Sequence, residues 1–201
     1  MLFYLAPMEG ITGYIVRNAY AHYFPYIDKY FTPFIPAAKK MSKKIKRDLA
    51  AENNGQIRLV PQLIGNRADE FLMMIRQLEE LGFTSVNLNF GCPSGTVVSK
   101  RKGAGFLADP KELEMLLEEV VENSPLAVSV KTRVGIKDPD EWEALCGVYA
   151  KFPLEELIIH PRQQKDYYSG TPRMETFARA LEQIHVPLCY NGDICSVEDY
   201  K

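Results

Sequence analysis

Short apolar runs alternate with amphipathic helical patterns along almost the whole chain, and this alternation restricts the fold more than any other feature. Each run is short enough for a strand, and the interval from one run to the next is mostly about 25–40 residues. We predict strands at residues 2–6, 27–31, 58–64, 85–89, 126–132, 155–160 and 187–191. Repeated strand–helix units of this length predict an α/β fold built on a parallel sheet.

Segments between these runs carry start and stop signals for helices. Apolar residues at helical spacing precede Gly82, which we expect to end that helix because glycine adopts the left-handed conformation at little cost. Asp109 is followed by Pro110 and Glu112, a pattern typical of an N-cap, a first-turn proline and an acid in the third helical position. The same pattern, beginning at Asp138, predicts a further helix.

Seven strand–helix units suggest a (β/α)₈ TIM barrel, a fold that typically needs about 250 residues. This chain has 201 residues, and residues 196–201 read as the opening turn of a helix with Ser196 as its N-cap. We therefore expect one domain, residues 1–201, that forms a TIM barrel incomplete at its C-terminal end, before the eighth strand. A doubly wound open sheet is the alternative, but no GxGxxG motif follows the first predicted strand.

Polar side chains stand at or near the carboxyl end of most of the predicted strands. In a barrel these ends meet on one face, which carries the active site in TIM-barrel enzymes. Each residue has a plain structural alternative: Gln62 could pair with backbone, Lys131 with a core carboxylate and His160 with a neighbouring strand. Their recurrence on successive strands favours a shared ligand. The residues are Gln62, Asn87, Asn89, Cys92, Lys131, Arg133, His160, Arg162, Asn191, Gly192 and Asp193.

The segment 85–93, SVNLNFGCP, combines a buried-strand pattern with groups that carry chemistry. A buried primary amide without a partner costs about 1–3 kcal/mol, so Asn89 needs one, and a planar ligand with donors and acceptors is suitable. Three residues later, Cys92 lies on a turn bounded by glycine and proline, where a thiol can exchange a proton with a substrate. The alternative is that Cys92 is a small buried apolar residue, the usual state of a free cysteine.

Several classes of protein are poorly supported. The sequence has no Walker loop, no HExxH motif and no zinc-type cysteine cluster, which argues against phosphoryl transfer and metal-dependent hydrolysis and predicts no metal site. No GxSxG motif marks a serine nucleophile. The four cysteines form no CxxC pair, and the N-terminal segment has neither a cationic start nor a long apolar run. We therefore expect a cytoplasmic protein with no membrane partner.

Two basic segments stand out in a chain whose formal net charge is −2. That charge gives no global positive field, but a local cluster can bind phosphates or simply form a solvated face. The second segment follows the Cys92 turn and so lies close to the predicted site. Tyr167 and Tyr168 offer rings for stacking on a base, or they pack their own loop. The segments contain Lys39, Lys40, Lys43, Lys44, Lys46 and Arg47, and then Lys100, Arg101 and Lys102.

Six segments, read in order, resemble the tRNA-dihydrouridine synthase family. They are LAPMEGIT near the N-terminus, VPQLIGN at 60–66, NLNFGCPS at 87–94, VKTRVG at 130–135, HPRQQKDYYSG at 160–170 and YNGDI at 190–194. The resemblance covers nearly the whole chain, and the combination of NxGCP with KTRxG is highly specific. It implies a TIM barrel that reduces a uridine in tRNA, with FMN as the cofactor and NADPH as the electron source.

The resemblance also implies roles for particular residues. Cys92 would be the proton donor, Asn89 would orient the uracil, and Arg133 would lie by the substrate. Their own chemistry, rather than the resemblance, makes Tyr168, Lys100 and Arg101 further candidates for contact with the substrate. The implied cofactor residues are Pro7, Met8, Gln62, Lys131 and His160 near the flavin ring, and Asn191, Gly192 and Asp193 near the ribityl phosphate. Family members also carry a loop after strand eight and a C-terminal helical domain that binds tRNA. Neither is in this sequence, so we expect this chain to bind FMN weakly or not at all.

Two other functions remain open from the sequence. A related flavin barrel, similar to dihydroorotate dehydrogenase, would act on a free pyrimidine, although the basic segments and the KTRVG segment argue against it. A non-catalytic RNA-binding remnant would contain no flavin. The sequence indicates neither the target uridine nor the oligomeric state.

Overall fold

The computed structural model describes residues 1–55 and 57–199 of the chain. Its strands are β1 (Tyr4–Leu5), β2 (Lys29–Phe31), β3 (Ile35–Pro36), β4 (Leu59–Val60), β5 (Gln62–Ile64), β6 (Ser85–Phe90), β7 (Ala127–Arg133), β8 (Leu157–His160) and β9 (Leu188–Tyr190). Its α-helices are α1 (Tyr14–Tyr23), α2 (Lys43–Leu49), α3 (Ala68–Glu80), α4 (Gly95–Val98), α5 (Pro110–Asn123), α6 (Glu141–Tyr149) and α7 (Met174–Gln183). Short 3₁₀ turns are η1 (Ala51–Asn53), η2 (Gly103–Ala108) and η3 (Gln164–Asp166).

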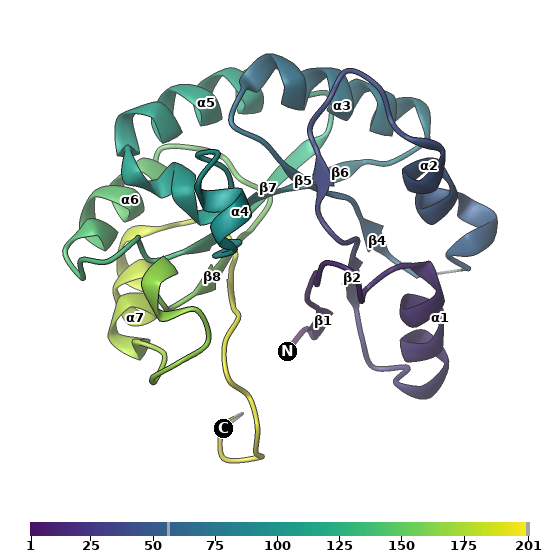
Figure 1. Ribbon diagram of the computed structural model, residues 1–201. Coiled ribbons are helices and arrows are strands. Elements are labelled where there is room, and N and C mark those ends of the chain that lie inside the picture. The colour runs from purple at the N-terminus through teal and green to yellow at the C-terminus, as the bar shows by residue number, and fades with distance from the viewer. Residues whose placement is uncertain (56, 200–201) are drawn as a thin grey trace.

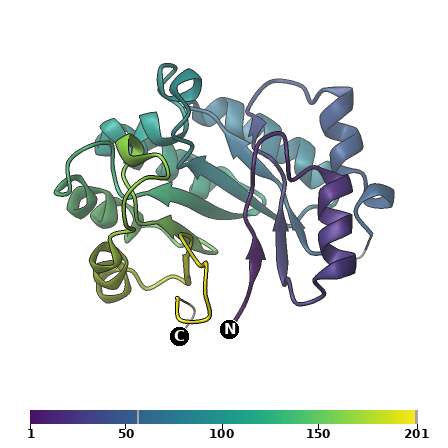
Figure 2. The same ribbon diagram turned by 60° about the horizontal axis from the view of Figure 1, so that its bottom comes forward.

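All strand pairs among the described residues are parallel. They form two sheets, in the orders β1-β2-β4 and β3-β5-β6-β7-β8-β9. Only Pro61 separates β4 from β5, and only residues 32–34 separate β2 from β3, so the two sheets are successive stretches of one curved wall. The helices surround this wall as a horseshoe, and the N-terminus and the last described residues before 200 lie at its open side (Figures 1 and 2). The arrangement is a partial TIM barrel, as predicted.

One predicted strand, 58–64, is wrong as a single element because it divides at Pro61 into β4 and β5. Proline has no N–H to donate to a strand ladder. The next backbone N–H, that of Gln62, bonds to the side-chain oxygen of Thr32 at 3.0 Å instead of to a strand carbonyl. The two-residue β3 was not predicted, since so short a strand leaves no alternating pattern in the sequence.

Two helix boundaries agree with the sequence prediction. Gly82 follows α3 with a φ of +87°, and its N–H bonds to the carbonyl of Glu79. Asp109 caps α5 through Oδ1, which accepts from the N–H groups of Lys111 and Glu112 at 3.0 and 3.2 Å. Among the described residues, no helix is both long and apolar enough to cross a membrane.

The predicted N-cap at Asp138 is wrong, because α6 begins at Glu141 with Asp140 as its N-cap, two residues later than predicted. Oδ1 of Asp138 accepts a hydrogen bond from the N–H of Asp140 at 3.1 Å, which makes a local turn rather than a helix cap. The Glu141 carboxylate reaches back to the N–H of Ile136. The carboxylates of Asp138 and Glu141 therefore stabilise the loop before α6, whereas the sequence pattern assigned them to the first turn of the helix.

The helix predicted at 196–201 reaches residues 200–201, which lie outside the described part. Within that part, Oδ2 of Asp199 accepts from the N–H of Ser196 at 2.9 Å, and Oγ of Ser196 accepts from the N–H of Asp199 at 3.2 Å. This reciprocal pair has the form of a capping box.

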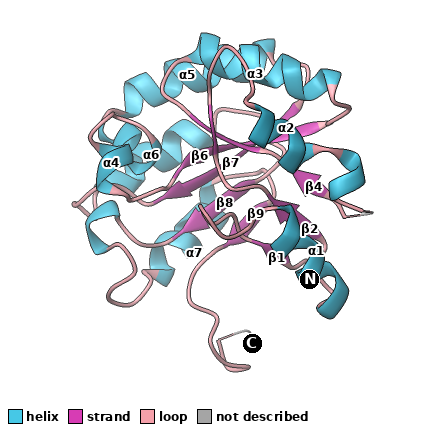
Figure 3. Cartoon of the chain, turned by 45° about the vertical axis from the view of Figure 1, so that its right-hand side comes forward, coloured by secondary structure: helices cyan, strands magenta, loops and turns pink. Residues whose placement is uncertain are grey.

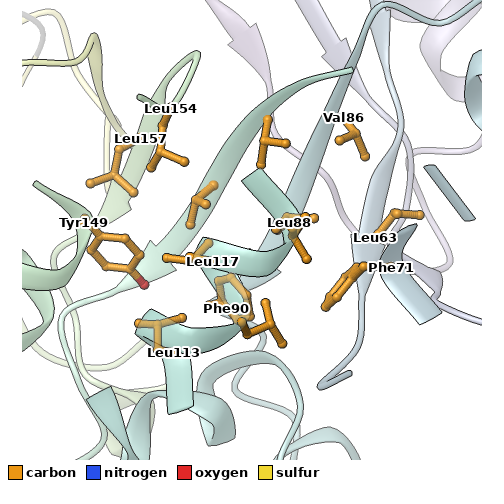
Figure 4. Packing of buried hydrophobic residues seen from close by; sticks show 14 of the residues in the cluster. Leu63, Phe71, Val86, Leu88, Phe90, Leu113, Leu117, Tyr149, Leu154 and Leu157 are labelled. Atoms are coloured by element: carbon orange, nitrogen blue, oxygen red, sulfur yellow. The ribbon is translucent and has the colours of Figure 1, made fainter. Parts of the chain in front are cut away.

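Alternation along the central strands separates the core from the inside of the wall. Side chains at every second position pack in one hydrophobic cluster (Figure 4), on the side of the sheet that α3, α5 and α6 cover (Figure 3). The positions between them face the inside of the wall. Val86, Leu88, Phe90, Val128 and Val130 therefore belong to the core, whereas Asn87, Asn89, Ser129, Lys131 and Arg133 line the inside.

Candidate active site at the carboxyl ends of the strands

Asn89 organises the turn that follows β6. Its side-chain oxygen accepts hydrogen bonds from the backbone N–H groups of Gly91 and Cys92, at 3.0 and 2.9 Å. Its Nδ2 donates to Oε1 of Gln62 at 2.8 Å. The amide thus has the partners that its burial requires, and they are protein groups. Its second Nδ2 hydrogen has no partner among the described residues, and Asn89 lines the cavity described below.

Gln62 lies behind Asn89 and is fully buried. Its Nε2 donates to Oδ1 of Asn87 at 2.7 Å, and Nδ2 of Asn87 donates to Oγ of Ser129 at 2.9 Å. The three amides form a hydrogen-bonded chain from β5 to β7 that fixes the orientation of Asn89. Gln62 does not line the cavity. Its contact with a flavin ring therefore stays a prediction.

Cys92 presents its partly exposed thiol to a cavity of about 500 Å³. Burial raises the pKa of this thiol, and the negative charge of Glu9 adds to the shift. The thiol therefore keeps its proton at neutral pH. The loop closes tightly on this residue, since a Cβ on Gly103 would lie 2.8 Å from the carbonyl oxygen of Cys92. Gly103 also has a φ of +54°, so both space and backbone conformation require glycine there.

Lys131 projects from β7 with no hydrogen-bond or ion-pair partner among the described residues. Burial, and then the nearby charge of Arg133, lower its pKa to about 8. The core carboxylate considered as a partner from the sequence is used elsewhere, because Glu156 pairs with Lys29 at 3.0 Å. A confined ammonium group without a counter-charge favours an anionic ligand.

Arg133 ties the Cys92 turn to the loop after β8. Its Nε donates to the carbonyl of Gly91 at 2.9 Å and its Nη1 to the carbonyl of Gln163 at 3.0 Å. Nearby, burial lowers the pKa of His160 to about 3, with a further contribution from Arg133 and the other cations. The His160 ring is therefore neutral at pH 7 and can make hydrogen bonds without adding positive charge.

The ring of Tyr168 lies over Arg133 and beside His160. The Tyr168 ring centroid lies 5.5 Å from Cζ of Arg133 and 6.3 Å from the ring of His160. Tyr168 is 72% exposed, so one face of its ring is open to solvent. The preceding residue, Tyr167, has a φ of +51°, a conformation uncommon for a residue other than glycine. The loop thus holds Tyr168 over the cavity at some conformational cost.

Asp193 forms a two-pronged ion pair with Arg162, with both N–O distances 2.6 Å. Arg162 is buried and also donates to the carbonyls of Ser169 and Gly170. The ion pair therefore joins the end of β9 to the loop that carries Tyr168. The Asp193 carboxylate is already paired with Arg162. Asp193 would therefore not bind a nearby phosphate itself but would orient the Arg162 guanidinium, which can bind one.

The structure brings most of the sequence-predicted residues to this one cavity. Lys100 and Arg101 lie outside its lining, and Arg101 pairs with Glu112 at 2.7 Å. No group of three or more histidine, cysteine, aspartate or glutamate residues in the described part is arranged to hold a metal ion. The predicted residues in the lining are Pro7, Met8, Asn89, Cys92, Lys131, Arg133, His160, Tyr168, Asn191, Gly192 and Asp193.

A larger cavity of about 1040 Å³ adjoins the first, between β1 and β9. The two cavities share Pro7, Lys131 and residues 191–193. A ligand that contacts Lys131 can therefore extend from one cavity into the other.

Two residues of the lining, Glu9 and Phe34, were given no role from the sequence. Glu9 is among the residues that follow the first predicted strand, but no contact was assigned to it. Phe34 precedes β3, which was not predicted, and no local signal marked it.

Comparison of the sequence with known proteins identifies a family to which this chain is similar. Residues 4–201 match the family described as Dihydrouridine synthase (Dus). A tRNA-dihydrouridine(16) synthase of Pseudomonas putida is 29% identical over 208 residues, which cover 98% of this chain and 64% of the relative. A tRNA-dihydrouridine synthase B of Pasteurella multocida is 28% identical, with 98% and 60% covered. A tRNA-dihydrouridine(20/20a) synthase of Vibrio parahaemolyticus is 32% identical, with 78% and 52% covered.

The match extends over nearly all of this chain but not over all of its relatives. The chain spans 64% of the length of the Pseudomonas putida protein, and less of the other two. The matched residues include every strand of the wall and the whole lining of the smaller cavity. The chain belongs to the dihydrouridine synthase family.

Proposed function

We propose that this chain is the catalytic barrel of a tRNA-dihydrouridine synthase, which reduces the C5–C6 double bond of a uridine in tRNA. FMN is the proposed cofactor and NADPH the proposed reductant. The observation that carries the proposal is the Cys92 thiol, which stands on a turn whose backbone Asn89 holds, at a cavity lined by Lys131 and His160. The names of the relatives support the same reaction and substrate.

The cavity residues suit FMN. Lys131 has no counter-charge among the described residues, so it matches the negative charge that a reduced flavin ring carries. Lys131 and His160 would hold the ring, with Pro7 and Met8 packed beside it. The phosphate would lie toward Asn191 and Gly192, with the Arg162 guanidinium behind them. When bound, FMN supplies the hydride that reduces the uracil ring.

The chain's own residues would do the remaining work. Cys92 would donate its proton to C5 of the uracil, and its raised pKa keeps that proton in place until it is needed. Asn89 would hold the Cys92 turn and use its remaining Nδ2 hydrogen on a uracil carbonyl. Arg133 and Tyr168 would form the wall against which a base flipped out of the RNA stacks.

The experiment replaces Cys92 with alanine in the full chain, with Cys195→Ala as the control because Cys195 is exposed and outside the cavity lining. We expect Cys92→Ala to keep the flavin absorbance and to lose about 10²-fold or more in dihydrouridine formation on unmodified tRNA. Undiminished turnover would exclude Cys92 as the acid.

The same assays separate the other two readings. Reduction of a free pyrimidine, without activity on tRNA, would favour the rival flavin barrel. Protein that binds RNA but takes up no flavin would favour the non-catalytic remnant. The relatives' names specify different positions in tRNA, 16 in one and 20/20a in another. A tRNA substrate agrees with the expected cytoplasmic location.

A further inference from the structure

Six exposed cations occupy the loop after β3 and the helix α2, and we call them the Lys39–Arg47 surface. No acid lies between Lys39 and Arg47 in the sequence, and none of the six forms an ion pair with another described residue. Other surface cations, such as Arg58, Arg67 and Lys151, pair with carboxylates. The Lys39–Arg47 surface consists of Lys39, Lys40, Lys43, Lys44, Lys46 and Arg47.

This surface has a fixed backbone. The side chain of Gln77 on α3 accepts a hydrogen bond from the N–H of Met41 at 3.2 Å and donates one to the carbonyl of Lys39 at 3.2 Å. On α2, Leu49 is buried in the core, and Asp48 turns away from the surface to pair with Arg17 at 3.0 Å. The backbone that carries these positive charges is therefore already ordered. A partner that binds them causes little further loss of backbone conformational entropy.

The surface stands on the same side of the wall as the cavity. Strands β3, β5 and β6 are parallel, so the loops that follow them emerge on one face, and α2 belongs to the outer layer of helices there (Figures 1 and 3). Phe34 lines the cavity and precedes Lys39 by five residues, which span less than about 18 Å even when fully extended. A polyanion with one residue in the cavity can therefore reach the surface.

We infer that the Lys39–Arg47 surface binds the phosphate backbone of the RNA whose uridine enters the Cys92 cavity. The inference rests on the proposed function, which requires a large polyanionic substrate. Contacts to phosphate position an RNA without reading its sequence, whereas contacts in the cavity select the base. The surface would therefore contribute to tRNA affinity and orientation and would not take part in the reduction.

The test reverses two of these charges, Lys43→Glu with Lys44→Glu, in the full chain. Both residues lie in the first turn of α2, where an acid is more favourable to a helix than a lysine. The variant is therefore expected to melt no lower than the parent chain, and reduced binding would not reflect lost folding. The matched control, Lys111→Glu with Arg179→Glu, makes the same change of charge at exposed, unpaired positions on α5 and α7.

Binding of an unmodified tRNA transcript is measured over a range of KCl concentrations. We expect the slope of log K against log salt to fall by about 1.4–1.8 for the surface variant, because each of the two lost phosphate contacts contributes about 0.7–0.9. The control should retain the parent slope. In turnover assays the surface variant should show a raised KM for tRNA with an unchanged kcat, because its side chains do not touch the reacting base.

Two outcomes would overturn the inference and separate it from the proposed function. If the parent chain forms dihydrouridine but the surface variant keeps the slope and KM of the control, the surface does not bind RNA and an acidic protein becomes its expected partner. If the parent neither binds tRNA nor forms dihydrouridine, the proposed function fails and the inference fails with it.

Discussion

The side-chain oxygen of Asn89 lies 2.9 Å from the backbone nitrogen of Cys92, and this hydrogen bond sets the position of the thiol-bearing turn. The same oxygen accepts from Gly91, so one buried amide holds both residues that follow β6. Asn89 is held in turn by Gln62. The proposed acid is therefore oriented by three hydrogen bonds that involve neither its own side chain nor a ligand.

Asn89→Ala should loosen this turn. The change removes three hydrogen bonds in a buried region, so we expect the free energy of unfolding to fall by about 2–3 kcal/mol. The Cys92 thiol should also react faster with iodoacetamide, measured in a Cys195→Ser background. Asn18→Ala, which removes an exposed side-chain hydrogen bond to Asn53, is the control. An unchanged rate of alkylation would mean that the turn is held by other contacts.

His160 should make stability depend on pH. Its folded pKa of about 3 lies below its ordinary value of 6.5, so the unfolded chain binds a proton that the folded chain does not. The contribution of His160 is fully present above pH 6.5 and is lost as the pH falls toward 3. We expect the parent to lose about 2 kcal/mol more than His160→Gln between pH 7 and pH 5. Urea unfolding at both pH values measures this, with the exposed His185→Gln as control.

Lys131→Met should stabilise the chain in the absence of ligand. At pH 7 the parent holds a confined ammonium group with a lowered pKa, so we expect the variant to gain about 2–3 kcal/mol. The gain should shrink as the pH rises from 8 to 10.5, where the folded parent has lost its proton. Lys29→Met is the contrast, because Lys29 pairs with Glu156 and its loss should destabilise. FMN titration should show weaker binding to Lys131→Met; equal affinity would remove Lys131 from the cofactor site.

Asp193→Asn should release the loop that carries Tyr168. Arg162 would lose its charged partner, and its hold on the carbonyls of Ser169 and Gly170 would weaken. We expect faster hydrogen exchange in residues 163–170 and weaker tRNA binding, with a stability loss of about 1 kcal/mol. Asp69→Asn breaks a comparable pair with Arg67 on the exposed surface and serves as control. Exchange equal to that of the control would show that the loop is held without this pair.

Lys100 and Arg101 should contribute unequally to RNA binding. Arg101 already faces Glu112 at 2.7 Å, whereas Lys100 is exposed and has no ion-pair partner among the described residues. We expect Lys100→Ala to reduce the salt-dependence slope by about 0.7–0.9, and Arg101→Ala to reduce it less. Glu112→Ala should then tighten binding by freeing Arg101. A larger effect from Arg101→Ala than from Lys100→Ala would contradict this order.

Local patterns in the sequence were enough to predict the elements and the side of the wall on which key residues lie. The alternating pattern in 85–89 places Asn89 and Leu88 on opposite faces of the strand. Asp109 correctly predicts the start of α5, and Gly82 correctly predicts the end of α3. These features depend on neighbours within a few residues, so a linear pattern can record them. The boundary at Asp138 was missed because a competing local turn uses the same side chain.

The tertiary structure alone decided which predicted residues meet and what each one bonds to. Arg162 and Asp193 are 31 positions apart, and the parallel pairing of β8 with β9 brings their side chains within 2.6 Å. The curvature of the wall brings Lys29 of β2 to Glu156, which precedes β8, and leaves Lys131 without a carboxylate. Pairings of this kind depend on how distant strands close around a shared interior. The sequence by itself therefore determined the strands, the helices and the polar strand ends, and the curvature of the wall brought those ends together into a site.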